Sequence, residues 1–345
     1  MKGDILALNY ESVVKYRPFD EHWDVVIFDE IHRLANWDSA LARYLTEAKL
    51  PRRRIGLTGT LCPEGYHQAI FPFSVIFGSW FWHTKSEDGL PAWCGERMAN
   101  WTYNEARYKL ETSDKHKKRC EAWIEANSSR LTQIQAGIHQ PKSWKTIMAP
   151  AGDCQRLYFD AMNAETPAER FQATWQAGSG IKDGKISITV PKFEMVVDAA
   201  KNSIADGIPV VVLARHTASI EYLEQRMRVQ KIRVARIDGK DGGVDYRAEV
   251  VRKLNAGEID CILAQVETVK VAINLSKAGM LIYAENSWSG ESRIQSEERL
   301  TCKGKAENVS IWDFCTRFSD GESMDLKISG TVRLKKDFNF NLLSK

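Results

Sequence analysis

An apolar run that ends abruptly in two carboxylates is the feature that most constrains what this chain can fold into. Residues 25–28 read Val-Val-Ile-Phe, and Asp29 and Glu30 follow at once. Such a run predicts a buried parallel strand that delivers its acids to the carboxyl edge of a sheet. Open α/β sheets bind their ligands at that edge. The run therefore predicts an α/β fold with a ligand site beside Asp29 and Glu30.

Two clustered acids at a sheet edge suit the chemistry of nucleotide hydrolysis. Asp29 can hold a hydrated Mg²⁺ on a nucleotide, and Glu30 can orient and deprotonate the attacking water. The alternative is a strand that happens to end in solvated acids, which is the commoner origin of a bare Asp-Glu pair. Here the pair is followed by His32 and by a second apolar strand that ends at Thr58 and Thr60. That order favours the nucleotide site.

The composition excludes several classes of protein. A chain of 345 residues that is 43% hydrophobic and 27% charged has room for two compact domains. Its net charge of +3 is too small to indicate a partner, and its seven cysteines include no Cys-x-x-Cys pair. The cysteines therefore indicate reduced thiols and not a disulfide framework or a zinc site. No apolar run has transmembrane length and the N-terminus lacks signal-peptide character, so we expect a cytoplasmic protein without a membrane partner.

The second half of the chain alternates short apolar strands with helical stretches. This alternation predicts a parallel sheet covered by helices on both faces. The predicted strands are 210–213, 234–237, 260–264, 280–284 and 309–314, and the predicted helices are 192–204, 219–228 and 244–254. A further helix is expected within 151–162, and the glycine-rich residues 178–184 are expected to form a flexible loop.

Residues 66–150 are aromatic and harder to pattern. Their six tryptophans favour the packing of a small helical subdomain over a stacking surface for single strands. A long charged stretch, residues 104–125, is helical in character. We therefore divide the chain into residues 1–150, with a helical insertion at their end, and residues 151–345.

The first motifs resemble a known family. Residues 29–36 read Asp-Glu-Ile-His-Arg-Leu-Ala-Asn, and residues 55–60 read Ile-Gly-Leu-Thr-Gly-Thr. They resemble motifs II and III of superfamily 2 helicases, which are DEAD/DEAH-like, and look most like the Swi/Snf-type branch of DNA-dependent ATPases. The resemblance implies an α/β fold with two RecA-like lobes, the first incomplete at its N-terminus, joined by a helical region. It implies ATP and Mg²⁺ as cofactors, with Asp29 and Glu30 at the metal and Glu30 as the catalytic base.

The same resemblance implies roles for neighbouring residues. His32, Thr58 and Thr60 would couple the nucleotide site to the DNA track. Residues 4–9 would form a strand whose following loop touches the nucleic-acid backbone, which makes Asn9 and Tyr10 candidates for that contact.

Further motifs follow in the family's order in the second half, which would be the C-terminal lobe with motifs IV to VI. Residues 237–239 with Arg247 resemble the family's Asp-Gly and Arg segment, residues 271–276 resemble motif V, and residues 295–299 resemble motif VI. Trp288 also stands where the family commonly has tryptophan. The resemblance implies that Arg299 stabilises charge on the γ-phosphate. It also implies that Gln295 couples the nucleotide to movement and that Asn274 contacts nucleic acid.

One part of the family's nucleotide site is missing from these residues. No Gly-x-x-x-x-Gly-Lys-Ser/Thr loop, which would hold the phosphates, occurs in the sequence, and only 28 residues precede Asp29. We therefore expect the chain to begin inside the first lobe, so that the strand ending at Thr58 has an unpaired edge. A separately encoded N-terminal fragment could cover that edge. ATP and Mg²⁺ would bind only with the loop supplied, and the isolated chain would be nearly inactive.

Two functions remain open at this point. The first is a Swi/Snf-like ATP-dependent DNA helicase or translocase without its phosphate-binding loop. The second is a non-catalytic module, derived from a helicase, that binds nucleic acid or protein. Cys302 replaces the second motif VI arginine and Ala272 replaces a usual motif V glycine, which favours the module. The presence of Asp29, Glu30 and Arg299 favours the enzyme.

Overall fold

The computed structural model forms two compact units, which are described separately. The first comprises Met1–Arg130 with Asp337–Lys345, and the second comprises Leu131–Lys336. The structure describes residues 5–36, 39–59, 61, 66–77, 101–104, 109–112, 124–126, 128–129, 135, 142–239, 243–269, 273–301 and 308–343. No helix among these residues is long and apolar enough to cross a membrane.

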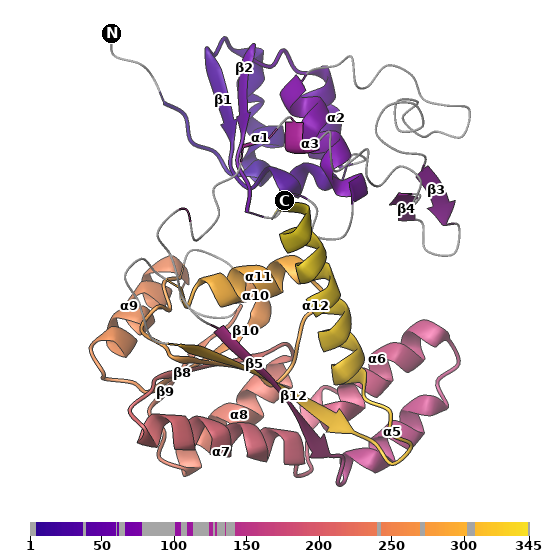
Figure 1. Cartoon of the computed structure of the whole chain (residues 1–345), viewed down its shortest axis with the longest axis vertical. Helices are drawn as coiled ribbons and strands as arrows, with labels where there is room; N and C mark the ends of the chain where they lie inside the picture. The colour runs from indigo at the N-terminus through magenta and orange to yellow at the C-terminus, as the bar shows by residue number, and fades with distance from the viewer. Residues whose placement is uncertain are drawn as a thin grey trace. The chain divides into compact units, whose positions relative to one another are not determined.

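A six-stranded parallel sheet forms the centre of the second unit (Figure 1). Its strand order is β5-β12-β11-β8-β10-β9, and every neighbouring pair is parallel. The strands are β5 (Lys142–Pro150), β8 (Val210–Ala214), β9 (Val234–Ile237), β10 (Cys261–Gln265), β11 (Met280–Tyr283) and β12 (Val309–Arg317). This is the parallel α/β sheet that the alternating pattern predicted.

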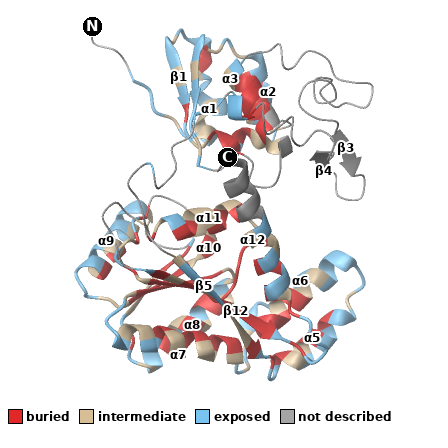
Figure 2. Ribbon diagram, in the orientation of Figure 1, coloured by how far each residue is buried: buried red, intermediate tan, exposed pale blue. Residues whose placement is uncertain are grey.

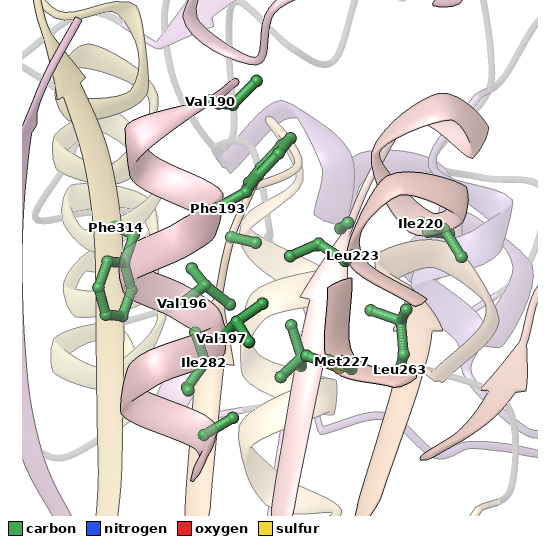
Figure 3. Close-up of a cluster of buried hydrophobic side chains, with 14 of the residues drawn as sticks. Val190, Phe193, Val196, Val197, Ile220, Leu223, Met227, Leu263, Ile282 and Phe314 are labelled. Atoms are coloured by element: carbon green, nitrogen blue, oxygen red, sulfur yellow. The ribbon is translucent and has the colours of Figure 1, made fainter. Parts of the chain in front are cut away.

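Helices cover both faces of this sheet. They are α7 (Pro191–Ala205), α8 (Thr217–Val229), α9 (Gly243–Asn255), α10 (Val266–Val269) and α11 (Gly290–Glu298). On one face, Phe193 and Val197 of α7 and Leu223 of α8 pack with Leu263 and Ile282 of the sheet (Figure 3). A separate cluster, which includes members of α9 and α10, packs on the other face. Strands buried on both sides have no polar face, and this explains the unbroken Val-Val-Val-Leu-Ala sequence of β8.

The predicted helices and strands of this half are confirmed with small shifts in their ends. The expected helix within 151–162 is α5 (Cys154–Met162). It is followed by α6 (Pro167–Gly178), where Thr166 and Glu169 form a capping box. The C-terminal helix α12 (Met324–Leu343) was not predicted.

The flexible loop predicted at residues 178–184 is wrong. The structure has an antiparallel hairpin there, β6 (Ile181–Lys182) and β7 (Lys185–Ile186). Asp183 and Gly184 connect the two strands with φ angles of 51° and 74°. An Asp-Gly pair adopts two successive positive φ values readily, which is the requirement of a tight hairpin turn.

The first unit contains a two-stranded parallel sheet, β1 (Val25–Phe28) with β2 (Arg53–Gly56). Around it lie α1 (Tyr10–Tyr16), η1 (Pro18–Asp20), η2 (Ile31–Ala35), α2 (Ala40–Glu47), η3 (Tyr66–Ala69) and α3 (Ile70–Phe77). One face of the sheet packs on these helices through a cluster that includes Phe28, Leu34, Leu45 and Phe71. Among the described residues β2 pairs only with β1.

Two predictions for the first half are wrong. Residues 5–9 form no strand, and Ile5 is 94% exposed, because no described strand pairs with them to satisfy their backbone groups. The helical character predicted for residues 104–125 is wrong at its start, where β3 (Trp101–Asn104) and β4 (Lys109–Thr112) are antiparallel strands, whereas residues 124–126 are helical.

The region before residue 151 also contributes to the second unit's sheet. β5 pairs with β12 along its whole length, although it precedes residue 151, where our second part was taken to begin. Its sequence, Lys-Ser-Trp-Lys-Thr-Ile-Met-Ala-Pro, is largely exposed at its start, with Trp144 48% exposed. An edge strand of this kind lacks the apolar run that reveals the inner strands.

Candidate functional site

The predicted acid pair lies at the carboxyl end of β1, directly beside the end of β2. The backbone N–H of Leu57 donates to the carbonyl of Phe28 at 2.9 Å, and that of Ile31 donates to the carbonyl of Leu57 at 2.9 Å. These bonds hold the residues after the two strands together. Glu30 has a left-handed φ of 49°. That conformation costs a non-glycine residue on the order of 1 kcal/mol or more and is found preferentially at functional sites.

His32 connects the two strand ends. Its side chain is 3% exposed, and its Nδ1 atom lies 2.7 Å from Oγ1 of Thr58 and 3.3 Å from Oε2 of Glu30. An imidazole with a proton on Nδ1 can donate to either oxygen, and the other tautomer can accept from the threonine hydroxyl. The structure therefore brings together Glu30, His32 and Thr58, which were predicted separately from two motifs. Thr60 lies outside the described residues.

Tyr10 and Asn9 also lie near this site, with contacts inside the chain. The Tyr10 hydroxyl donates to the carbonyl oxygen of Asp29 at 2.7 Å, and Asn9 caps α1 by accepting from the N–H of Ser12 at 2.8 Å. Burial raises the pKa of Tyr10, so its hydroxyl stays protonated and can donate. Tyr10 thus supports the backbone at Asp29, and Asn9 supports the start of α1. Their contact with nucleic acid stays a prediction.

The residues at the end of β1 fit a magnesium ion that is shared with a nucleotide. No group of three or more metal-ligating side chains occurs within the part of the chain that the structure describes. Mg²⁺ commonly takes only one or two carboxylates from the protein and completes its octahedron with phosphates and water. Asp29 is exposed and Glu30 is partly exposed, so both can be reached by such a ligand.

The predicted residues of the second unit gather around the end of α11. Gln295 and Arg299 are one helical turn apart and partly exposed, and the Arg299 N–H donates to the Gln295 carbonyl at 3.1 Å. The motif V segment is tied to the same turn, because the Leu275 N–H donates to the Arg299 carbonyl at 2.9 Å. The neighbouring Asn274 is exposed, and its side chain accepts from the N–H of Ser276 at 3.0 Å. Motifs V and VI are therefore neighbours in space.

A buried ionic network anchors α11 to the sheet. The Arg293 guanidinium, 2% exposed, contacts Oε1 of Glu297 at 2.7 Å and Oδ1 of Asp313 at 2.5 Å. It also donates to Oδ1 of Asn286 at 2.8 Å. Burial alone would raise the pKa of Asp313, but Arg293 and its hydrogen bonds hold that pKa below its usual range. The sequence analysis missed this network, although the spacing of Arg293 and Glu297 is that of a helical ion pair.

A second buried carboxylate, Glu285, holds the loop after β8. Its Oε2 accepts from the backbone N–H groups of Arg215 at 2.7 Å and His216 at 2.9 Å. Its Oε1 accepts from Oγ of Ser219 at 2.7 Å and lies 3.1 Å from Nδ1 of His216. Burial would raise the pKa of Glu285, but His216 and Lys192 and the hydrogen bonds keep that pKa well below its usual range. Glu285 is therefore ionised at neutral pH.

The sequence contained a signal for Glu285 that the analysis did not use. Like Asp29, Glu285 follows a run of apolar residues in the sequence. A related buried pair lies nearby, where Nζ of Lys192 contacts Oδ2 of Asp325 at 2.9 Å and donates to Oγ of Ser179 at 3.2 Å. Burial would lower the pKa of Lys192, but Asp325 and Glu285 raise it, and the amine stays charged.

Comparisons with known proteins identify the family. Residues 191–304 match the family model described as the helicase conserved C-terminal domain. These residues include β8 to β11 and α11, and therefore the motif V and motif VI segments described above. These matches support a Snf2-like helicase of superfamily 2.

Two of the similar proteins are much longer than this chain. A rice (Oryza sativa subsp. japonica) protein named probable chromatin-remodeling complex ATPase chain is 21% identical over 94% of this chain and 30% of its own length. Human chromodomain-helicase-DNA-binding protein 6 is 23% identical over 91% of this chain and 12% of its own length. The C-terminal part of the Fun30 ATPase domain aligns in structure with 59% of this chain and 98% of its own, at 12% identity and a TM-score of 0.47. This Snf2-like chain thus spans at most about a third of the length of these curated relatives.

Proposed function

We propose that this Snf2-like chain is part of an ATP-dependent DNA translocase. The observation that carries the proposal is the contact of His32 with both Glu30 and Thr58, since it joins a candidate catalytic base to the end of the neighbouring strand. A side chain that bridges the base and the next strand can transmit a change at the nucleotide to the protein around it.

Each of the predicted site residues has a separate role in the proposed ATP hydrolysis. Asp29 would hold Mg²⁺, and Glu30 would orient and deprotonate the water that attacks the γ-phosphate. Mg²⁺, when bound, neutralises charge on the phosphate oxygens. Arg299 stabilises the charge that develops during transfer, while Gln295, His32, Thr58 and Thr60 couple hydrolysis to movement on nucleic acid.

Hydrolysis in this proposal needs a phosphate-binding loop, which the 345 residues do not contain. The loop would come from another segment, which would also pair with the open edge of β2 and cover the exposed apolar face of the two-stranded sheet. ATP and Mg²⁺ would bind tightly only in its presence. Without it, the chain would hydrolyse ATP negligibly.

DNA is the proposed track, because the names of the relatives include DNA-binding and chromatin-remodeling. Asn9, Tyr10 and Asn274 are the predicted contacts with the nucleic-acid backbone. The cytoplasmic location stays a prediction.

The test is an ATPase assay of the chain with a purified segment that contains the loop, with and without duplex DNA. We expect DNA-stimulated hydrolysis that Glu30→Gln lowers at least ~100-fold, because a positioned general base contributes about that much. Glu47→Gln, an exposed acid at the end of α2, is the control and should leave the rate unchanged. Absence of ATPase activity with the segment present would overturn the proposal. DNA-stimulated hydrolysis by the chain alone would refute the requirement for the loop.

A non-catalytic binding module is the second candidate. The replacement of an expected motif VI arginine by Cys302 favours it, since no nearby lysine reproduces the planar guanidinium fork. The test is again the unmodified chain with the loop segment present. DNA binding that weakens with added salt, without any nucleotide binding, would favour this module over the translocase.

A further inference from the structure

Arg215 is a partly buried arginine whose charged group has no polar partner in the described structure. It follows β8, where its backbone N–H donates to Glu285 at 2.7 Å and its carbonyl accepts from Nε2 of Gln265 at 3.0 Å. Its guanidinium carbon lies 4.5 Å from the centre of the Trp175 ring. Among the residues that the structure describes, no hydrogen bond or ion pair to this guanidinium is formed. The backbone is therefore fixed while the side-chain donors remain available.

Glu285 is the nearby acid, but its acceptor sites are already taken by other donors. A carboxylate has about four lone-pair sites. Those of Glu285 face the N–H groups of Arg215 and His216, the His216 ring and the Ser219 hydroxyl. The carboxylate that positions the Arg215 backbone is thus already saturated. An anion for the Arg215 side chain has to come from another source.

The support under the guanidinium is rigid and aromatic. Trp175 is 1% exposed, and its ring packs against His216 at 5.5 Å and Trp288 at 6.3 Å between centroids. Phe171 lies 5.1 Å from Trp288 in the same cluster. A guanidinium held over such a ring can still use the N–H groups of its planar fork, which match phosphate oxygens. Lysine could not be held in this way.

We propose that Arg215 binds a phosphate of the nucleic-acid backbone, with Trp175 and Glu285 as the residues that position it. The inference rests on the proposed DNA partner and adds a contact to the motif V and motif VI segments. It places that contact at the carboxyl end of β8, the edge of a parallel sheet at which ligands bind. Arg215 itself touches the phosphate, while Trp175 and Glu285 act through it.

The experiment measures binding of the full chain to a fluorescein-labelled duplex by fluorescence anisotropy, at NaCl concentrations from about 50 to 200 mM. For Arg215→Ala we expect affinity at low salt to fall ~10-fold and the slope of log K against log salt to become shallower by about one unit. Arg215→Lys keeps the charge and loses the stacked fork. It should restore the slope of the wild type while affinity stays roughly 3-fold lower.

Arg228→Ala is the matched control, since it removes the same charge from an exposed arginine on α8 that pairs with Glu224. It should bind as the wild type does. If Arg215→Ala also binds as the wild type does, the phosphate contact is refuted. If it lowers the thermal unfolding temperature by more than a few degrees, Arg215 is a structural residue and the proposal is likewise refuted.

Two further outcomes separate this inference from the proposed function. If the wild-type chain binds neither duplex nor single-stranded DNA, the proposed function fails and this contact fails with it. If Arg215→Ala leaves DNA binding intact but lowers the affinity for a fluorescent ATP analogue, the phosphate belongs to a nucleotide, and only the assignment to nucleic acid is overturned.

Discussion

The two parallel sheets of this chain differ in how far they are buried. In the second unit every residue of β8 and β11 is buried, as the red strands of Figure 2 illustrate. In the first unit Phe28 is the one buried residue of β1, and β2 has none. The face of β1 and β2 opposite the helices exposes Ile27 by 57% and Leu57 by 49%.

This difference shows that one strand pattern can have two structural outcomes. Parallel strands are normally covered on both faces. The second unit meets this requirement with helices on each side, whereas the first unit has one covered face among its described residues. The stability of the first unit should therefore depend on a single cluster, and its outer face offers apolar area to another element.

The largest expected effect contrasts a buried ion pair with an exposed one. Arg293→Met in the second unit leaves Glu297 buried without its cation and leaves Asp313 with Arg333 and Asn286 alone, which should lower the free energy of unfolding by about 3–5 kcal/mol. Arg33→Met breaks the pair with Glu11 in the first unit, where the two side chains are 49% and 66% exposed. Its cost should be at most about 1 kcal/mol. Urea unfolding followed by circular dichroism measures both, and equal costs would contradict the comparison.

A slightly smaller effect is expected from the same substitution, isoleucine to alanine, in each of the two sheets. Ile282→Ala in β11, where the side chain is fully buried, should cost about 2–5 kcal/mol. Ile27→Ala in β1 should cost roughly 0.5 kcal/mol or less, because more than half of the side chain is already in water. Hydrogen exchange within each unit reports the two values separately. A large loss at Ile27 would mean that the outer face is covered in solution.

The smallest expected effect is the loss of stability at low pH that the Glu285 carboxylate causes. The pKa of Glu285 is lowered in the folded chain, so its carboxylate contributes stability above the unfolded pKa of about 4.3, and this contribution is lost as pH falls further. The loss should approach about 1.4 kcal/mol per pH unit below that value. Glu285→Gln should therefore be less stable than the wild type at pH 7, and the gap in unfolding temperature should narrow toward pH 3. For Glu11→Gln, at an exposed site, the gap in unfolding temperature should be small at every pH.

Much of the second unit could be predicted from its sequence. Its inner strands are unbroken apolar runs, and a run of that kind needs no distant partner to be recognised. The edge strand β5 was missed because it is half exposed and carries lysine and tryptophan, so it is a strand only through its pairing with β12. The hairpin at Asp183 and Gly184 was missed because its glycines were taken as a sign of flexibility and not of a specific turn.

The candidate site was predicted in part. The acids after β1 and the threonine after β2 were found because strand ends are visible in a sequence. The contact of His32 with both Glu30 and Thr58 was not visible, since it depends on the register between β1 and β2. Asn9 was assigned to nucleic acid by resemblance alone, and in the structure it caps α1.

The sequence by itself determined where the strands of the second unit run and where polar groups follow them, because apolar runs and their ends are local properties. Only the tertiary structure decided which of those groups became buried supports and which stayed available. Glu285 and Asp29 follow similar strands, yet Glu285 is enclosed by donors from the loop after β8 and Asp29 remains exposed. The reason is that a charge can be buried only with partners that are distant in the chain, and a local sequence pattern does not show which residues these will be.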